Sequence, residues 1–314
     1  MMPKRICVFS CAVLVLLLCL ATGAQAFKVG TWKTAQTIQP FYYDQFSKEP
    51  VRVYSFTNPA DQKTALLAGA LDICGTTLAH AIHSAAQGQP VVVVAALCNK
   101  CSAFVVQNKG PVQAAADLKG KRIGYVPGTM HEILLRETLV KNGLNPDIDV
   151  KLIRVDFFDM GLALARGNID AFLSGEPFPT QAVLKGYGRM LSYPYFGDTV
   201  GTINAGMLVT RKAIDKNFEQ VFNMVRAHAR ATAFLKAHPQ VWLKKAAGFG
   251  TSMKVLKAAS ENMELAWNMD AAFVARVRAL GERMQALGMI KTQPDYDKLI
   301  DLSFVKRLKA EGAL

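Results

Sequence analysis

The chain has 314 residues, of which 51% are hydrophobic and 19% charged, a composition that excludes a disordered protein. Its formal net charge of +13 could attract a nucleic acid, a membrane surface or an anionic small molecule. Because the Lys and Arg residues are scattered, with no basic run interleaved with aromatic residues, we expect no nucleic-acid partner.

The first 26 residues have the three parts of a secretory signal peptide. Lys4 and Arg5 form a positive head, residues 8–20 are almost wholly apolar, and residues 24–26 (Ala-Gln-Ala) form a cleavage site. An uncleaved anchor is the alternative, but the apolar run is shorter than the roughly 20 residues of a membrane span. A large residue before Cys19 does not fit a lipoprotein site. We therefore predict cleavage after Ala26 and a periplasmic mature chain whose charge falls from +13 to +11 as the two head residues leave.

From residue 27 onward, strand and helix patterns alternate, which predicts an α/β fold with helices covering largely parallel sheets. In the first series we expect strands at 27–32, 51–56, 71–74 and 90–97, an extended run at 103–107, and helices at 58–68 and 76–88. In the second we expect strands at 122–126, 150–155 and 169–173, and helices at 129–142, 160–166 and 177–185. An extended run at 204–210 follows, and then apolar residues at three- and four-residue spacing predict a mainly helical remainder.

One short pattern occurs twice. Residues 67–73 and 165–171 both give a helix end, Gly, one residue, Leu or Ile, Asp and a strand, and a polar turn (75–77 or 174–177) follows each. Because both copies lie within the same strand–helix order, we predict two similar lobes. Ligands bind beyond the carboxyl ends of strands in such sheets, so the two turns should face each other across a cleft.

Three cysteines remain after the signal peptide: Cys74, Cys98 and Cys101. Outside the cytoplasm a disulfide between Cys98 and Cys101 is the favoured interpretation of this C-x-x-C pair. A redox dithiol is the alternative, although nothing around the pair resembles thioredoxin. A zinc site would need further ligands, and Ser102 stands where haem attachment needs His. Cys74 is expected to be a buried free thiol.

No metal or other cofactor is predicted. His80 and His83 lie three residues apart on one helix, but no carboxylate or cysteine nearby completes a metal-ligand set.

These features resemble those of the periplasmic solute-binding proteins of nitrate, sulfonate and taurine importers, a group that includes relatives of thiamine-pyrimidine synthesis proteins. The matching stretches are 66–77, 117–124, 128–131 and 167–177. The resemblance implies a type 2 periplasmic-binding fold: two lobes, each a mixed β-sheet covered by helices, with a ligand cleft between them. We place two crossover strands near 105–109 and 203–206. Lobe 1 would then contain residues 27–107 and 205–314, and lobe 2 residues 108–204.

The same resemblance implies the solute-binding component of an ABC importer, a monomer that closes by a hinge and serves a membrane permease. Its ligand would be a small polar or anionic molecule that is sulfonate-, nitrate-, taurine- or pyrimidine-like. An enzyme of the pyrimidine-synthesis type is one alternative, but the dense cysteine cluster of those enzymes is missing, and no nucleophile with a base is evident. The ligand-binding partner of a membrane sensor is another alternative.

Helix N-termini present unpaired N–H groups, at which anions and polar groups bind. Around three such helix starts, and at the strand ends near them, we predict the ligand contacts Trp32, Thr34, Gln36, Thr76, Thr77, Gly128, Thr129, Met130, Phe158, Glu176 and Asn204. Thr76 or Thr77 could be an ordinary helix cap, Gly128 could serve only a tight turn, and Glu176 could cap the helix at 177. His131 is expected to be a surface or capping residue.

Overall fold

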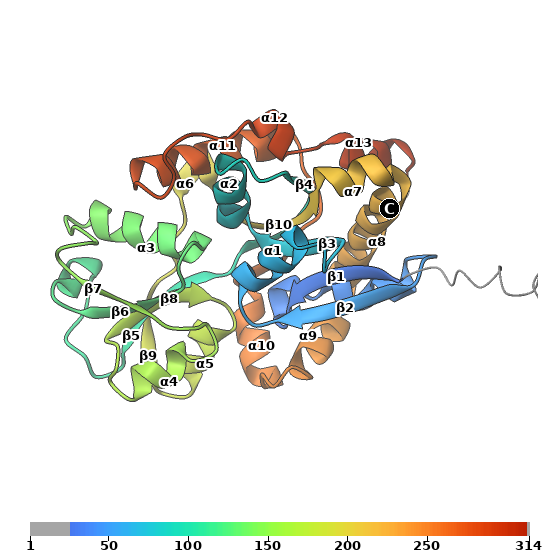
Figure 1. The fold of residues 1–314 in the computed structure, drawn as a ribbon. Coiled ribbons are helices and arrows are strands. Elements are labelled where there is room, and N and C mark those ends of the chain that lie inside the picture. Colours follow the sequence, from blue (N-terminus) through green and yellow to red (C-terminus); the bar gives the residue numbers. More distant parts are fainter. Residues whose placement is uncertain (1–25, 313–314) are drawn as a thin grey trace, which may run out of the picture.

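A computed structural model describes residues 26–312 and shows two α/β lobes side by side (Figure 1). The predicted signal peptide lies outside the described residues except for Ala26. No helix within the described range is long and apolar enough to cross a membrane.

The first lobe is built on a six-stranded mixed sheet in the order β11-β4-β10-β3-β1-β2. Its strands are β1 (Phe27–Trp32), β2 (Val51–Phe56), β3 (Ile73–Thr77), β4 (Val91–Lys100), β10 (Ile203–Thr210) and β11 (Met263–Leu265). β1 pairs in parallel with β2 and β3, whereas β10 runs antiparallel between β3 and β4. The carboxyl ends of β1, β2 and β3 therefore share one edge of the sheet.

The second lobe is built on a five-stranded sheet in the order β7-β6-β8-β5-β9. Its strands are β5 (Ser102–Gln107), β6 (Arg122–Tyr125), β7 (Lys151–Arg154), β8 (Ala171–Gly175) and β9 (Gly188–Ser192). β6 is parallel to β7 and β8, and β5 is antiparallel to β8 and β9. The mixed sheets agree with the predicted fold class; β9 and β11 were not predicted.

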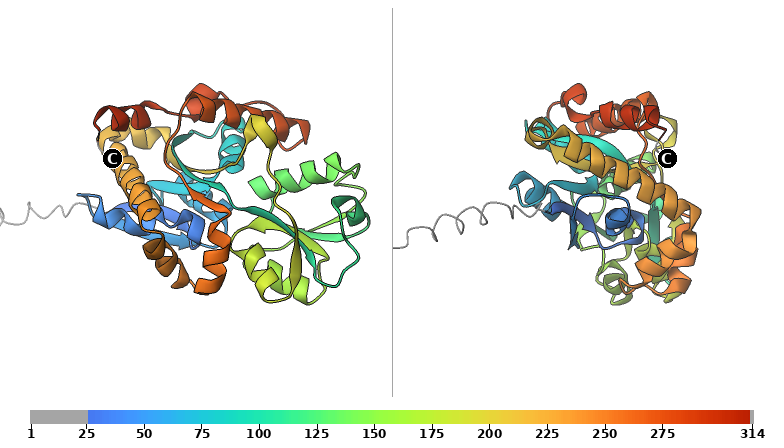
Figure 2. Two further views of the ribbon diagram at one scale, coloured as in Figure 1. Left: turned by 180° about the vertical axis from the view of Figure 1, so that it is seen from behind. Right: turned by 90° about the vertical axis from the view of Figure 1, so that its right-hand side faces the viewer.

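Helices cover both sheets, and those after β10 surround the first lobe (Figure 2). The α-helices are α1 (Pro59–Leu67), α2 (Leu78–Ala86), α3 (Met130–Lys141), α4 (Met160–Ala165), α5 (Phe178–Leu184), α6 (Gly197–Val200), α7 (Arg211–Lys216), α8 (Phe218–Ala237), α9 (Pro239–Ala247), α10 (Met253–Ser260), α11 (Ala271–Ala286), α12 (Tyr296–Leu299) and α13 (Ser303–Ala310). Short 3-10 helices occupy Ala35–Thr37 (η1), Gln39–Gln45 (η2) and Ala115–Leu118 (η3). The predicted cap of α1 is present, since Asn58 Oδ1 accepts a bond from Ala60 N at 2.8 Å.

The repeated sequence pattern has the same structural role in each lobe. Asp72 Oδ2 accepts a hydrogen bond from Lys28 N at 2.7 Å, and Asp170 Oδ2 accepts one from Arg122 N at 2.8 Å. In both cases the carboxylate ties the turn before a strand to the neighbouring parallel strand. Each lobe thus fixes the amino ends of two parallel strands, whose carboxyl ends point toward the other lobe.

The chain crosses between the sheets at Cys101 and again between β9 and β10 (Figure 1). Residues 102–107, placed in the first lobe from the sequence, pair with β8 and β9 of the second sheet. The first crossing therefore lies at Cys101, not near 105–109. Lys100 and Cys101 have φ angles of 59° and 72°, and this left-handed turn ends the long strand β4.

Candidate functional site

A small cavity lies between the lobes, where the carboxyl ends of β1, β2 and β3 face those of β6, β7 and β8. We call it the inner compartment. Its lining residues are Trp32, Thr34, Gln36, Thr57, Pro59, Thr77, Thr129, Met130, His131, Phe157, Phe158, Gly175, Phe178 and Asn204. Its volume is about 20 Å³, which is space for about one water molecule. Both lobes contribute to it, as expected for strand ends that meet across a cleft.

Two polar atoms at this cavity are buried without a protein partner: the indole Nε1 of Trp32 and the amide Oε1 of Gln36. A buried polar group without a partner costs about 1–3 kcal/mol, so native proteins rarely leave one without a reason. Two other polar groups of the lining are already paired. Thr34 Oγ1 lies 2.9 Å from Thr37 Oγ1, and Asn204 Nδ2 donates to the Lys100 carbonyl at 2.9 Å.

His131 belongs to the site, although the sequence suggested a surface or capping role. It lies in the first turn of α3 and is 5% exposed, with Nδ1 at 3.2 Å from Ser102 Oγ. Burial lowers its pKa to about 4, so the imidazole is neutral at physiological pH. A Cβ added to Gly175 would lie 2.8 Å from His131 Nε2 and 3.2 Å from Gln36 Nε2. Gly175 is therefore needed to keep this space open.

The lobes touch directly beside the cavity. Met130 N, at the start of α3, donates to Thr77 Oγ1 of the first lobe at 3.3 Å. The imidazole of His80 on α2 donates a hydrogen bond to the backbone carbonyl of Pro127 in the second lobe. Gly128 has φ +73°, and a Cβ there would lie 2.9 Å from His80 Nε2. Gly128 thus allows the close approach of the lobes and does not line the cavity.

Thr76 also stays outside the lining. Its hydroxyl bonds the Pro59 carbonyl at 3.3 Å and lies 3.3 Å from His80 Nδ1. Its hydroxyl therefore joins the end of β3 to the start of α1.

Aromatic rings form one wall. Phe157 and Phe158 follow β7, and Phe178 begins α5. Phe158 contacts Phe178 edge-on with ring centroids 4.8 Å apart, and Phe157 meets the His131 ring edge-on at 5.7 Å. The sequence indicated Phe158 but missed Phe157 and Phe178, which are adjacent to predicted residues at the ends of β7 and β8.

Glu176 is fully buried but does not line the cavity. Its carboxylate accepts bonds from Thr180 N at 3.1 Å and Thr180 Oγ1 at 2.9 Å. This is the capping role that the sequence offered as an alternative. Burial raises its pKa from 4.5 to about 7, against the opposing effect of these hydrogen bonds. The peptide bond to Pro177 is cis.

The cysteines differ from expectation. Cys98 and Cys101 are free and buried in the structure, so the predicted disulfide is not formed. Cys101 Sγ instead accepts a bond from Asn204 Nδ2 at 3.1 Å. Burial raises the pKa of Cys98 to about 12 and holds that of Cys101 well above its usual range, so both thiols are protonated and poor nucleophiles. Cys74 is buried and free, as predicted.

A family model described as "NMT1/THI5 like" matches residues 50–241, more than half of the chain. The chain belongs to the NMT1/THI5-like family. The matched segment of this family member runs from the start of β2 to the first turns of α9 and so includes most of the cleft.

Curated relatives have different roles. The 4-amino-5-hydroxymethyl-2-methylpyrimidine phosphate synthase of Schizosaccharomyces pombe is 32% identical over 43% of this chain and 38% of its own length. A putative binding protein of Brucella abortus is 31% identical over 59% of this chain and 57% of its own length. A putative aliphatic sulfonates-binding protein of Escherichia coli is 26% identical over 55% of this chain and 54% of its own length. The chain thus matches about two fifths to three fifths of these relatives.

Solved structures agree on the fold. The alkanesulfonate-binding protein SsuA from Xanthomonas axonopodis pv. citri bound to MOPS superposes with a TM-score of 0.78 at 19% identity, over 88% of this chain and 98% of the other. The periplasmic nitrate-binding protein NrtA from Synechocystis gives a TM-score of 0.76 at 15% identity, over 92% and 89%. The desulfurization enzyme DSZB gives 0.69 at 14% identity, over 91% and 99%. The two-lobed binding-protein fold is therefore shared by binding proteins and by an enzyme.

The structure brings most of the predicted contacts to one cavity, namely Trp32, Thr34, Gln36, Thr77, Thr129, Met130, Phe158 and Asn204. It leaves Thr76, Gly128 and Glu176 outside and adds Thr57, Pro59, His131, Phe157, Gly175 and Phe178. Within the part of the chain that the structure describes, no group of three potential metal ligands exists.

Proposed function

We propose that this chain is the extracytoplasmic solute-binding component of an ABC importer, exported to the periplasm with residues 1–26 removed. It binds a small polar or anionic molecule between its lobes as a monomer and delivers it to a membrane permease. The observation that carries this proposal is the pair of unpartnered buried atoms, Trp32 Nε1 and Gln36 Oε1, at a cavity lined by both lobes. A ligand that pairs with both atoms removes the cost of leaving them buried and unbonded.

Opening of the lobes is part of the proposed cycle. A cavity of about 20 Å³ cannot accept a solute larger than about one water molecule, so the lobes must part for entry. The contact between Thr77 Oγ1 and Met130 N, together with the ion pair between Arg283 of α11 and Glu137 of α3, would break and re-form during this motion. Such a hinge closes when a ligand binds the closed form better than the open one.

The chemistry of the lining supports a ligand held by hydrogen bonds and ring contacts. Among the described residues that line the inner compartment, the only ionisable side chain is His131, and its lowered pKa keeps it neutral. Hydroxyl, amide, indole and imidazole groups can bind a nitrate, a sulfonate, a taurine-like molecule or a pyrimidine, and the phenylalanine wall can stack on a planar one.

Two relatives favour an enzyme as the second candidate, since the Schizosaccharomyces pombe relative and DSZB are both named as enzymes. The neutral His131, whose Nδ1 is already bonded to Ser102, and the protonated, buried cysteines support binding without chemistry. Mass spectrometry of a bound ligand after prolonged incubation tests this point: a binder returns it unchanged.

A third candidate function is that of a ligand-binding partner of a membrane sensor. It would require the same binding of a solute between the lobes.

A thermal-shift panel of sulfonates, nitrate, amino acids and pyrimidines tests the site. We expect at least one small polar member to raise the Tm of the wild type and to have no effect on Gly175→Ala, whose methyl group would occupy the space beside His131 Nε2. Gly161→Ala is the matched control, because its Cβ would meet nothing nearer than Ala182 Cβ at 3.6 Å. If only large apolar or cationic compounds raised the Tm, or if Gly175→Ala responded like the wild type, the proposed site would be wrong.

A further inference from the structure

A second and larger cavity adjoins the inner compartment. We call it the outer compartment. It has a volume of about 210 Å³ and is lined by Lys33, Thr34, Ala35, Phe158, Pro177, Phe178, Gln181, Ala246, Phe249, Gly250, Thr251 and Leu256. Its walls come from the segment after β1, from the loop between α9 and α10, and from the start of α5. The outer compartment therefore also lies between the two lobes.

Three residues, Thr34, Phe158 and Phe178, line both compartments, so the two cavities share a wall. Phe158 is 43% exposed. Exposed side chains change rotamer within nanoseconds, so this ring can turn aside without disturbing the packed core. A ligand longer than the inner compartment can thus continue into the outer one.

The two compartments differ in charge. Lys33 lines the outer compartment and is its one charged side chain among the described residues. Its Nζ lies 5.8 Å from the centre of the Phe249 ring, and no carboxylate of the described chain lies within ion-pair distance of it. Asp156 and Asp159, which flank Phe158 in sequence, line neither cavity. The ammonium group of Lys33, at the rim of the cleft, is therefore available to an anionic group of a ligand.

On the first lobe, the outer compartment is bordered by α9 and α10, which lie in a stretch without acidic residues. Residues 223–260, which include most of α8 and all of α9 and α10, contain no Asp or Glu. Lys244, Lys245, Lys254 and Lys257 lie on α9 and α10, which border the outer compartment, whereas Arg226 of α8 is paired with Glu311. A cleft bordered by charges of one sign concentrates ligands of the opposite sign.

We infer that the ligand is elongated: an uncharged polar head occupies the inner compartment once the lobes have parted enough to widen it, and an anionic group (sulfonate, phosphate or carboxylate) lies in the outer compartment beside Lys33. This inference rests on the proposed function and specifies the ligand class of that same site. Lys33 then selects ligands by their charged end, while Trp32 and Gln36 select them by the head. The helix starts of the inner compartment bind the neutral end, and the anion stays near the entrance.

Matched pairs of ligands that differ only in the anionic group test this assignment. One pair is 4-amino-5-hydroxymethyl-2-methylpyrimidine with and without its phosphate. The other is MOPS and 4-(3-hydroxypropyl)morpholine, in which a hydroxyl replaces the sulfonate. Isothermal titration at low salt and at about pH 9, where the morpholine nitrogen is unprotonated, should show the anionic member of a bound pair to be tighter by about tenfold, the size expected for a charge-assisted hydrogen bond. Lys33→Gln should reduce that ratio to near one and leave the affinity for the neutral member unchanged.

Lys212→Gln is the matched control, because Lys212 is exposed on α7 and lines neither compartment. It should keep the tenfold preference. A neutral member that binds as tightly as its anionic partner, or a preference that survives Lys33→Gln, would overturn this inference and leave the proposed function standing. Failure of both pairs and of the whole thermal-shift panel would overturn the proposed function as well.

Discussion

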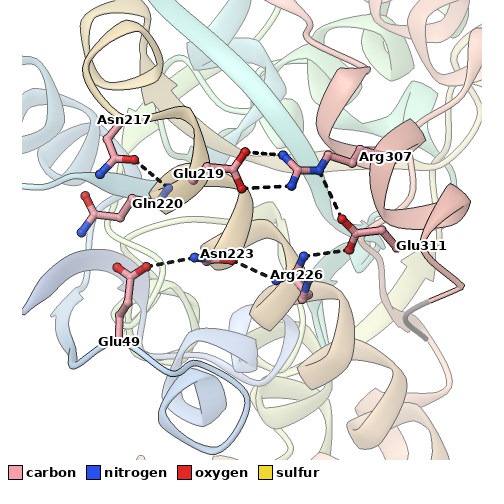
Figure 3. A network of polar contacts seen from close by, with 8 residues as sticks. All are labelled: Glu49, Asn217, Glu219, Gln220, Asn223, Arg226, Arg307 and Glu311. Carbon is pink, nitrogen blue, oxygen red and sulfur yellow. Dashed lines mark hydrogen bonds and ion pairs between the residues drawn. The ribbon is translucent and has the colours of Figure 1, made fainter.

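The cleft and the contact between α8 and α13 use polar side chains in opposite ways. At the contact between α8 and α13, every charged group of a continuous network is paired (Figure 3). Arg307 binds both Glu219 and Glu311, and Arg226 reaches Glu311 at 2.7 Å and Asn223 Oδ1 at 2.9 Å. In the inner compartment the lining is uncharged, and two buried polar atoms have no partner.

This difference separates polar groups that hold the fold from polar groups that are available to a ligand. The network joins the C-terminal helix to α8 and, through Asn223 Nδ2 and Glu49 Oε1 at 3.0 Å, to the segment before β2. A fully paired network has no capacity left for another molecule. The unpaired indole and amide of the cleft can still bond to another molecule. Variants in the network should therefore change stability, and variants in the cleft should change ligand affinity.

The largest effect on stability is expected at Glu176, because this carboxyl group is buried and has a raised pKa. Although it lies beside the cleft, it is bonded to Thr180 of the helix that follows it. Its pKa of about 7 exceeds the 4.5 of an ordinary glutamate. The folded protein therefore holds this proton between pH 4.5 and 7 while the unfolded chain loses it. The bound proton of Glu176 contributes fully to the free energy of unfolding below pH 4.5, and this contribution is lost as pH rises through 7. The change in the free energy of unfolding is about 3 kcal/mol.

Glu176→Gln should therefore unfold at higher urea than the wild type at pH 8 and at about the same urea concentration at pH 4.5. Glu282→Gln, on an exposed residue of α11, is the control for a change of net charge. The urea midpoints of Glu176→Gln and the wild type could instead differ by the same amount at pH 4.5 and pH 8. That result would show that Glu176 does not cause this pH dependence.

Two tryptophans give a second and smaller test of the same distinction. Trp242 Nε1 donates to the Ala35 carbonyl at 2.6 Å, whereas Trp32 Nε1 has no partner. Trp242→Phe should lower the free energy of unfolding by about 1 kcal/mol more than Trp32→Phe, because only the first leaves a carbonyl unbonded. Trp32→Phe should instead weaken ligand binding by about tenfold. Urea titration and calorimetry measure the two effects, and a reversed order would contradict the assignment of roles.

The smallest effect is expected in the network. Arg307 is 39% exposed, and its guanidinium lies 4.0 Å from the Phe222 ring centre. Exposed ion pairs contribute little and are screened by salt. Arg307→Met should cost less stability than Trp242→Phe, most of it at low salt, and should leave ligand affinity unchanged. A loss of affinity would mean that the network and the cleft are coupled.

Much of the fold was predictable from local pattern. The strands at 27–32 and 51–56 and the cap at Asn58 follow from alternation and from the Asn-Pro start. The repeated Gly-x-(Leu/Ile)-Asp pattern indicated the two lobes, because each Asp fixes the same strand junction. The crossing at Cys101 was misplaced, since β4 and β5 form one nearly continuous apolar run and only the sheet to which each half pairs separates them.

The site was predictable where a strand end or a helix start carries a polar or aromatic residue, as at Trp32, Thr77 and Thr129. His131 was misjudged because its burial depends on the other lobe and on Ser102, which lies 29 residues earlier in the chain. The Cys98–Cys101 disulfide was misjudged because spacing alone does not reveal that Cys101 is bonded to Asn204. Residues whose role depends on contacts between lobes are those that a local pattern cannot assign.

The most direct test of the central claim, that a small solute binds between the lobes, is a fluorescence titration with Trp32 as the reporter. A ligand chosen from the thermal-shift panel should change the tryptophan emission of the wild type and of Trp242→Phe, and most of this change should disappear in Trp32→Phe. An undiminished change in Trp32→Phe, with unchanged affinity, would place the ligand away from the cleft and contradict the account.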